Sequence, residues 1–222
     1  MTARLILVRH GPSAHTHTGA LDRAGVQRWR DAYDAAGIRV AVQPPPALSE
    51  IAAGATHIIA SDLRRAVESA ERLAPQRQIR LSPLMREAPL AIPRWPTHLP
   101  LAAWDALMHT GWIYRRVRGA DPTGPDWTRA AAAAQWLASI VADGTTALVV
   151  THGVFRQLVA THLVRLGWRS AGRRSGYRHW SFWSFAVPML PPSSTRDLSP
   201  LRHVHPPQPP NGEREEPAEH EH

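Results

Sequence analysis

The segment LILVRHG, residues 5–11, places four apolar residues directly before an arginine, a histidine and a glycine. A short, continuous apolar run of this kind is typical of a strand that is buried on both faces of a parallel sheet. Further strand candidates follow at residues 57–60 (HIIA), 79–84 and 147–150, and residues 178–187 alternate roughly like a final strand. The opening segment therefore predicts the first strand of a mostly parallel sheet.

Segments with apolar residues at helical spacing separate these strands. The predicted helices span residues 22–36, 46–53, 63–74, 101–113, 126–141 and 153–166. The first stops at Gly37 and the third stops before Pro75, both common helix terminators. Strands that alternate with helices predict an α/β fold, a three-layer α/β/α sandwich with a mostly parallel central sheet.

The length of 222 residues, 43% of them hydrophobic, suits one domain with a real core. We predict this domain over residues 1–188. A stretch rich in Pro and Trp begins at residue 88 and interrupts the alternation, and we expect a lid or cap over about residues 88–125. Residues 189–222 carry many prolines among Ser, Arg, Glu and His and offer little to bury, so we predict a disordered tail there.

The net charge is +8, and every basic residue other than histidine is an arginine. These arginines are spread along the chain and form no stripe with interleaved aromatic residues, which argues against nucleic-acid binding. No apolar run approaches the roughly 20 residues of a membrane span, and the apolar stretch near the N-terminus is too short for a secretory signal. The absence of cysteine excludes disulfides and thiolate metal sites. We expect a cytoplasmic protein that binds neither nucleic acid nor membrane; the oligomeric state stays open.

Residues that can carry chemistry follow four of the predicted strands. They are Arg9, His10, Gly11 and Ser13; then Ser61, Asp62, Arg64 and Arg65; then Arg86 and Glu87; and finally Thr151, His152 and Gly153. In open α/β sheets, ligands bind beyond the carboxyl ends of the strands, so we expect these residues to converge on one rim. Each of them alone has an ordinary structural explanation, and only their joint placement points to a site.

That set of residue types suits phosphoryl transfer. Guanidinium groups match the oxygens of a phosphate monoester in geometry and charge. An unprotonated imidazole is a competent nucleophile, and a second histidine can stabilise the transferring group as a charged donor. Gly153, at the start of a helix, would direct backbone N–H groups toward an anion. A shielded carboxylic acid can protonate the leaving oxygen.

Four motifs, in this order, resemble those of the histidine phosphatase superfamily, also called phosphoglycerate mutase-like, from Leu5 to about Val187. LILVRHGPS is similar to its opening strand and Arg-His-Gly motif, which implies His10 as the nucleophile and Arg9 as a phosphate ligand. IIASDLRRAVESA resembles its Ser-x-Leu-x-Arg-Ala pattern, which implies Arg65 as the second phosphate arginine. LMREA resembles the motif that supplies the acid, and ALVVTHGVFRQL resembles the closing strand and His-Gly motif.

The resemblance implies a phosphoglycerate mutase-like fold and a phosphohydrolase that works without metal or cofactor on a small phosphorylated substrate. The candidate catalytic residues are His10, Glu87 and His152, with His10 carrying the phosphoryl group and Glu87 giving the proton. The candidate phosphate-binding residues are Arg9, Arg65, His152, Thr16, Ser13 and Gly153. Thr16 stands where many relatives have an asparagine. Arg94, Trp95 and His98 are candidate substrate contacts in the lid; packing of the tryptophan in a helical cap is an equally good explanation.

Three alternatives stay open. A phosphoglycerate mutase-type transferase would need a long basic insertion after the acid residue, and we see none between Glu87 and Asp126. A metal-dependent hydrolase would use His15, His17 and other histidines, but no Asp/Glu cluster stands at ligand spacing. A regulatory module that binds phosphate and hydrolyses it slowly would not need the whole residue set.

Overall fold

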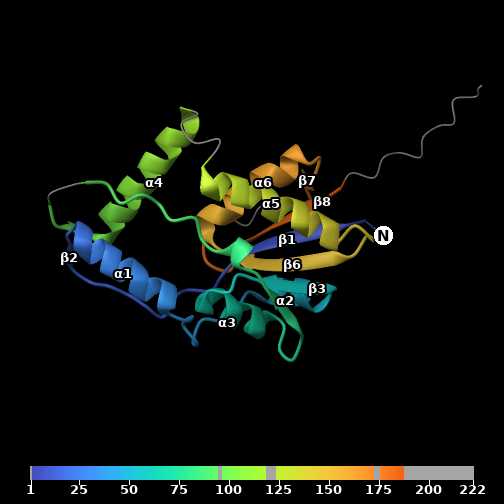
Figure 1. Cartoon of the computed structure of the whole chain (residues 1–222). Coiled ribbons are helices and arrows are strands. Elements are labelled where there is room, and N and C mark those ends of the chain that lie inside the picture. The colour runs from blue at the N-terminus through green and yellow to red at the C-terminus, as the bar shows by residue number, and fades with distance from the viewer. Residues whose placement is uncertain (1, 95–96, 119–123, 173–175, 188–222) are drawn as a thin grey trace, which may run out of the picture. The chain divides into compact units, whose positions relative to one another are not determined.

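The computed structural model describes residues 2–94, 97–118, 124–172 and 176–187 (Figure 1). The chain divides into two units, Met1–Met189 and Leu190–His222. All described residues belong to the first unit. The predicted disordered tail over residues 189–222 therefore lies outside the described residues.

The described part of the chain contains the following elements. The strands are β1 (Arg4–Arg9), β2 (Ala20–Leu21), β3 (His57–Ala60), β4 (Ile79–Leu81), β5 (Leu99–Pro100), β6 (Thr146–Thr151), β7 (Arg169–Ser170) and β8 (Phe182–Ala186). The helices are α1 (Arg23–Ala35), α2 (Pro46–Ala53), α3 (Arg64–Leu73), α4 (Leu101–Val117), α5 (Pro125–Ile140) and α6 (Gly153–Arg165), with a 3₁₀ turn η1 (Pro83–Met85).

The central sheet has six strands in the order β4-β3-β6-β1-β8-β7. Strands β4, β3, β6 and β1 are parallel to one another, and β8 runs antiparallel to β1 and β7. The predicted mostly parallel sheet is therefore confirmed. Strands β2 and β5 form a separate two-stranded ribbon that leads into α4.

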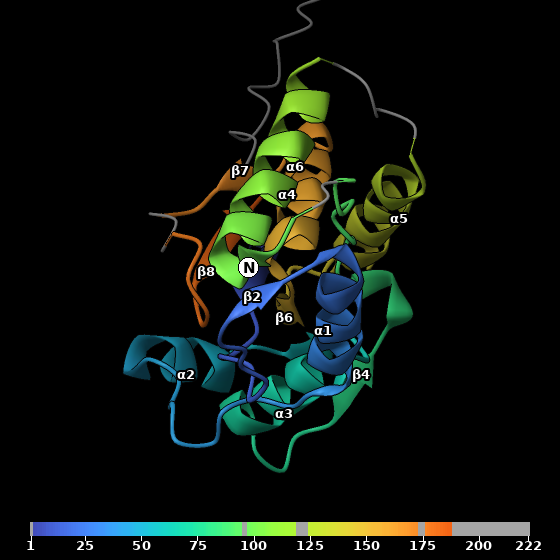
Figure 2. The same cartoon turned by 90° about the vertical axis from the view of Figure 1, so that its left-hand side faces the viewer.

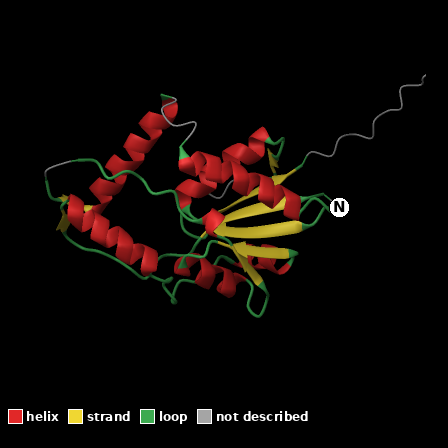
Figure 3. Ribbon diagram, in the orientation of Figure 1, coloured by secondary structure: helices red, strands yellow, loops and turns green. Residues whose placement is uncertain are grey.

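The alternating residues of β1 divide the core into two clusters. Leu5 and Leu7 pack with residues of α4, α5 and α6, whereas Ile6 and Val8 pack with residues of α2 and α3. Helices consequently cover both faces of the strands, as Figures 2 and 3 show. This confirms the predicted three-layer sandwich, and it explains why the opening segment is apolar at every position rather than at every second one.

Local chemistry explains several element boundaries. Asp22 is the N-cap of α1, where its carboxylate accepts the Gly25 N–H at 2.7 Å. Pro46 and Pro125 occupy the first positions of α2 and α5, where a missing N–H costs nothing. The third strand, predicted over residues 79–84, ends at Leu81 because the chain turns into the η1 helix at Pro83.

The prediction of the last strand was wrong at its start. We expected it over residues 178–187, and β8 begins only at Phe182. Trp180 has a φ of 61° and cannot continue an extended strand. Its backbone N–H instead donates to the Arg9 carbonyl at 3.1 Å. Residues 178–181 therefore form a loop against the end of β1.

Candidate active site

The residues predicted to converge do lie at one rim of the sheet. Arg9 ends β1 opposite Thr151, which ends β6, and Ala60 ends β3 opposite Val150. The residues that come next in the chain, His10 and His152, leave the sheet at the same level, and their ring centroids are 5.0 Å apart. Parallel strands deliver their carboxyl ends to one edge, so the register of three strands positions the centre of this site.

His10 is buried, with 2% of its surface exposed, and its tautomer follows from its contacts. Its Nδ1 lies 2.7 Å from the Gly11 carbonyl oxygen, which can only accept, so Nδ1 carries the hydrogen. Nε2 is then the basic nitrogen, and it accepts the Nε–H of Arg65 at 3.3 Å. Burial, and then the positive charges around it, hold the pKa of His10 well below its ordinary value of 6.5. The ring is therefore neutral at neutral pH, with its lone pair directed toward a guanidinium group.

Arg65 is 1% exposed and held from two sides. Its Nη1 donates to the Tyr33 carbonyl at 3.1 Å and lies 3.0 Å from the Asp34 carboxylate. The neighbouring Arg64 is exposed and pairs instead with Glu68 one turn along α3. The structure thus brings Arg65, and not Arg64, to His10.

His152 is fully buried at the N-cap position of α6. Its Nε2 lies 2.9 Å from the Ser61 hydroxyl, which follows β3, and its Nδ1 has no hydrogen-bond partner among the described residues. Burial, and then Arg65 and Arg9, hold the pKa of His152 well below its ordinary value. The lowered pKa favours a neutral ring in the site as it stands, and a neutral ring still offers one N–H; the role of His152 as a charged donor to a transferring phosphoryl group stays a prediction.

Arg9 lies between the loop before β8 and the start of α6. Its Nη1 donates to the Tyr177 carbonyl at 2.6 Å, and its buried Nε–H has no partner in the described part of the chain. A Cβ on Gly153 would lie 3.4 Å from the Arg9 guanidinium carbon, so the glycine leaves this side chain just enough room.

Glu87 is held at the N-terminus of α6. Its Oε1 accepts the backbone N–H groups of Phe155 at 2.8 Å, Ala88 at 3.0 Å and Val154 at 3.2 Å, while Oε2 has a single contact, to Val154 at 3.4 Å. A carboxyl group at this end of a helix satisfies N–H groups that the helix leaves unpaired.

A half-buried arginine holds the loop that carries Glu87 in place. Arg129 on α5 donates from Nη1 to the carbonyls of Leu84 and Arg86 at 2.9 and 2.7 Å, and from Nη2 to the Glu87 carbonyl at 3.3 Å. Its guanidinium also stacks on Phe155 at 3.9 Å. The position of Glu87 is therefore fixed from both its side chain and its backbone.

The remaining predicted site residues are not drawn into this cluster. Ser13 is buried, but its hydroxyl accepts the His15 N–H at 3.1 Å within its own loop. Thr16, Arg94 and His98 are exposed, and Trp95 lies outside the described residues. Their predicted roles stay predictions.

The histidines of the metal hypothesis do not gather into a ligand set. His17 is exposed, and His15 is half-buried in the loop after β1. Over the described ranges, no three His, Cys, Asp or Glu side chains are grouped as metal ligands would be.

Sequence reasoning missed His179 and Tyr33. The His179 ring centroid lies 5.3 Å from that of His10, and burial lowers its pKa to about 4. His179 precedes β8, and an antiparallel strand starts at the rim where its parallel neighbours end. The prediction considered only residues that follow strands and therefore missed His179. Including the residues at the start of the last predicted strand would have identified it. Tyr33 comes from α1, whose distance from the strands in sequence gave no signal.

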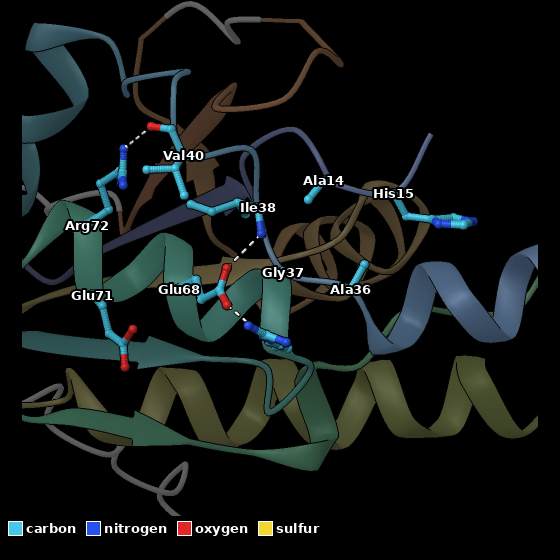
Figure 4. A pocket seen from close by; sticks show the side chains of 10 residues that line it. Ala14, His15, Ala36, Gly37, Ile38, Val40, Glu68, Glu71 and Arg72 are labelled. Atoms are coloured by element: carbon cyan, nitrogen blue, oxygen red, sulfur yellow. Dashed lines mark hydrogen bonds and ion pairs between the residues drawn. The ribbon is translucent and has the colours of Figure 1, made fainter. Parts of the chain in front are cut away.

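A cavity of about 710 Å³ lies between α3 and residues 36–40 (Figure 4). His15, Arg64, Glu68, Glu71 and Arg72 contribute its polar side chains. The Glu68 carboxylate is occupied by the Ile38 N–H at 2.7 Å and by Arg64. His10 does not line this cavity.

Comparisons with known proteins point to one family. A model of the histidine phosphatase superfamily (branch 1) matches residues 5–176. No curated protein sequence matches the chain. Within the described residues, no helix combines the length and apolar character needed to cross a membrane.

Among solved structures, a phosphoserine phosphatase variant from Entamoeba histolytica with bound phosphoserine shares 19% identity, covering 73% of this chain and 80% of that chain, with a TM-score of 0.46. A mycobacterial glucosyl-3-phosphoglycerate phosphatase shares 20% identity, with 74% and 83% covered and a TM-score of 0.45. The ecdysone phosphate phosphatase of the silkworm Bombyx mori shares 14%, with 86% and 94% covered and a TM-score of 0.48.

These identities are too low to carry a substrate from one protein to another. The family model, in contrast, matches the chain from β1 to β7. The matched residues include all four sequence motifs whose residues lie at the rim of the sheet. The chain belongs to the histidine phosphatase superfamily (branch 1) and is a phosphatase-type enzyme.

Proposed function

We propose that this protein is a metal-independent phosphomonoesterase that works through a phosphohistidine on His10, with Glu87 as the proton donor. The observation that carries the proposal is the fixed tautomer of His10. The Gly11 carbonyl holds the hydrogen on Nδ1, and Nε2 keeps its lone pair beside the Arg65 guanidinium, where a phosphate would bind.

In the first step, Nε2 of His10 attacks phosphorus and the bond from phosphorus to the ester oxygen breaks. Glu87, in its protonated form, gives its proton to that oxygen, and the alcohol leaves. Oε1 of Glu87 is occupied by backbone N–H groups, so Oε2, with one contact at 3.4 Å, is the oxygen free to carry the proton. Arg9 and Arg65 neutralise the phosphoryl oxygens.

In the second step, water attacks the phosphorus of phosphohistidine and the P–N bond breaks. The Glu87 carboxylate takes the proton from the water, which restores its starting form, and inorganic phosphate leaves with His10 neutral again. The neutral resting state of His10 follows from its lowered pKa and readies it for another turnover.

Trapping the phosphoenzyme tests this proposal. Phosphohistidine is labile in acid and survives base, so an alkaline quench during turnover of a labelled phosphomonoester should leave label on His10. His10→Ala should remove both label and turnover. His57→Ala is the matched control, because His57 begins β3 at the opposite end of that strand. Wild-type turnover by His10→Ala would overturn the mechanism, and release of inorganic phosphate in the same assay separates hydrolysis from transfer to a second substrate.

Chelation tests the metal independence. We expect unchanged turnover after dialysis against a strong chelator, because the proposed cations are the guanidinium groups of Arg9 and Arg65. Lost activity that returns with a divalent metal would contradict the proposal and favour the metal-dependent alternative.

A further inference from the structure

A row of aromatic side chains runs from His10 along α1. The ring centroids of His10 and Tyr33 are 6.3 Å apart, those of Tyr33 and Trp29 are 5.0 Å apart, and those of Trp29 and His15 are 6.1 Å apart. Trp29 and Tyr33 are four positions apart and therefore share one face of the helix. We call Tyr33, Trp29 and His15 the aromatic row.

Tyr33 contacts Arg65, a proposed phosphate ligand, and feels the charge of Glu87, the proposed proton donor. The Arg65 guanidinium lies over its ring, 4.6 Å from the centroid. Burial raises the pKa of its hydroxyl; Arg65 and Arg9 act against that shift, and Glu87 acts with it. The hydroxyl is therefore neutral, and it feels the charge of both the phosphate-side cations and Glu87. Because the leaving alcohol departs toward the proton donor, the row beginning at Tyr33 lies where that alcohol needs a surface.

Trp29 brings an unused hydrogen-bond donor to the row. Its Nε1 is buried and has no hydrogen-bond partner among the described residues, although the residue as a whole is only half-buried. A buried donor without an acceptor destabilises the folded protein, and a ligand that supplies an acceptor removes this cost.

The row offers flat faces rather than additional positive charge. Trp29 and Tyr33 are neutral, and Arg30, next to Trp29 in sequence, directs its guanidinium to the Leu90 carbonyl at 2.7 Å and the Met108 sulfur at 3.2 Å. A substrate with a second phosphate would need free cations here, and the two arginines that line the neighbouring cavity are occupied, Arg64 by Glu68 and Arg72 by the Val40 carbonyl. At its outer end, His15 also lines the 710 Å³ cavity (Figure 4). The successive ring contacts of the row thus connect His10 with a residue of that cavity.

We propose that the aromatic row binds the alcohol part of the substrate, and that this part is a planar ring bearing a hydrogen-bond acceptor that meets the Trp29 N–H. The inference rests on the proposed phosphomonoesterase function and names its substrate class. Ring stacking on Trp29 and Tyr33 supplies the affinity, and the indole N–H selects for the acceptor.

Three esters test the inference. Benzyl phosphate and propyl phosphate release alcohols of similar basicity, so the chemical step is matched and the ring is the difference; pyridylmethyl phosphate adds a ring acceptor. We expect kcat/KM for benzyl phosphate to exceed that for propyl phosphate by about tenfold or more. Trp29→Ala should remove this preference and leave the propyl value within about twofold.

Two further variants refine the test. Trp29→Phe should keep the preference for benzyl over propyl and lose any additional preference for the pyridylmethyl ester, since it keeps a ring and lacks the N–H. Trp136→Ala is the matched control on α5, where Trp136 stacks with Arg80 at 4.9 Å, and it should leave all ratios unchanged.

Binding separates this inference from the proposed function. Benzylphosphonate and propylphosphonate cannot be hydrolysed, and calorimetry should show tighter binding of the benzyl compound to the wild type and no preference in Trp29→Ala. Equal affinity for both in the wild type, or a parallel loss for both in Trp29→Ala, would overturn the aromatic row while leaving the phosphohistidine mechanism intact. Preferential binding without turnover of any ester would overturn the mechanism instead.

Discussion

The backbone N–H of Gly11 donates to the hydroxyl of Ser69 at 2.8 Å, and that hydroxyl donates in turn to the Arg65 carbonyl at 2.6 Å. One buried serine thus ties the residue after His10, the proposed nucleophile, to the helix turn that carries Arg65. The distance between His10 and Arg65 depends on this tie as well as on their own contact.

Ser69→Ala should therefore reduce activity more than an ordinary serine deletion would. It leaves the Gly11 N–H buried without a partner, which costs about 1–3 kcal/mol of unfolding free energy. The shift of His10 relative to Arg65 should lower kcat by about tenfold or more. Urea unfolding and steady-state kinetics measure the two effects. Ser139→Ala, which removes a similar bond on the exposed side of α5, should change neither.

Glu87→Gln separates the acid role from the structural one. The amide oxygen can still accept the Phe155 N–H, so stability should change little, whereas Glu87→Ala should destabilise the start of α6 by about 1–2 kcal/mol. Turnover of alkyl phosphates should fall by about 100-fold or more, and turnover of aryl phosphates with good leaving groups much less. Glu50→Gln, an exposed carboxylate on α2, is the control. Equal losses on good and poor leaving groups would remove Glu87 from the acid role.

Three histidines at the candidate site, two buried and one half-buried, predict how stability depends on pH. The pKa of His179 is lowered to about 4, and those of His10 and His152 are also lowered from 6.5. Below pH 6.5 the unfolded chain binds protons that the folded chain does not, so the unfolding free energy falls as pH decreases from 6.5 toward 4. Each such histidine contributes up to about 1.4 kcal/mol per pH unit.

Chemical denaturation at several pH values measures this slope. His179→Gln should make it shallower by up to the contribution of one histidine between pH 6.5 and 4. An unchanged slope in that variant would mean that His179 is protonated in the folded protein.

Gly11→Ala and Gly111→Ala should have opposite effects. A Cβ on Gly11 would overlap the Trp180 ring, so alanine must displace the tryptophan, which costs about 1–3 kcal/mol. A Cβ on Gly111, within α4, meets nothing within 4 Å, and alanine there should stabilise the helix by up to about 1 kcal/mol. Thermal unfolding checks both, and activity should fall only in Gly11→Ala.

The sequence predicted the elements with strong local signals. The strand at residues 57–60 and the helix at residues 46–53 have the bounds expected from a pure apolar run and from a proline at the first helical turn. Strands β2, β5 and β7 have two residues each and carry no recognisable pattern, because only tertiary pairing defines them. The alternation of apolar and polar residues predicted a start for the last strand that is too early. The reason is that Trp180 has a positive φ of 61°, which an extended strand does not allow.

For the candidate site, the sequence predicted the residues that directly follow parallel strands. It did not predict the residues that lie on a helix or before an antiparallel strand. His10 and His152 follow strands whose order is readable, so their meeting could be predicted. Tyr33 reaches the site from the end of a helix, and His179 from a loop that precedes an antiparallel strand. Their positions depend on packing between distant segments, which no local pattern encodes.

Strand β1 lies between β6 and β8, so Arg4 pairs with Thr146 on one side and with Ala186 on the other. The paired residues are far apart in the sequence, so long stretches of chain must close into loops before the pairings stabilise the sheet, and this slows folding. During synthesis on a ribosome, the proposed nucleophile His10 emerges early. It lacks both neighbouring strands until most of this domain has been synthesised. A nascent chain that already contains His10, Arg65 and Glu87 should therefore be inert, and catalytic competence should arise only when the final strand completes the sheet.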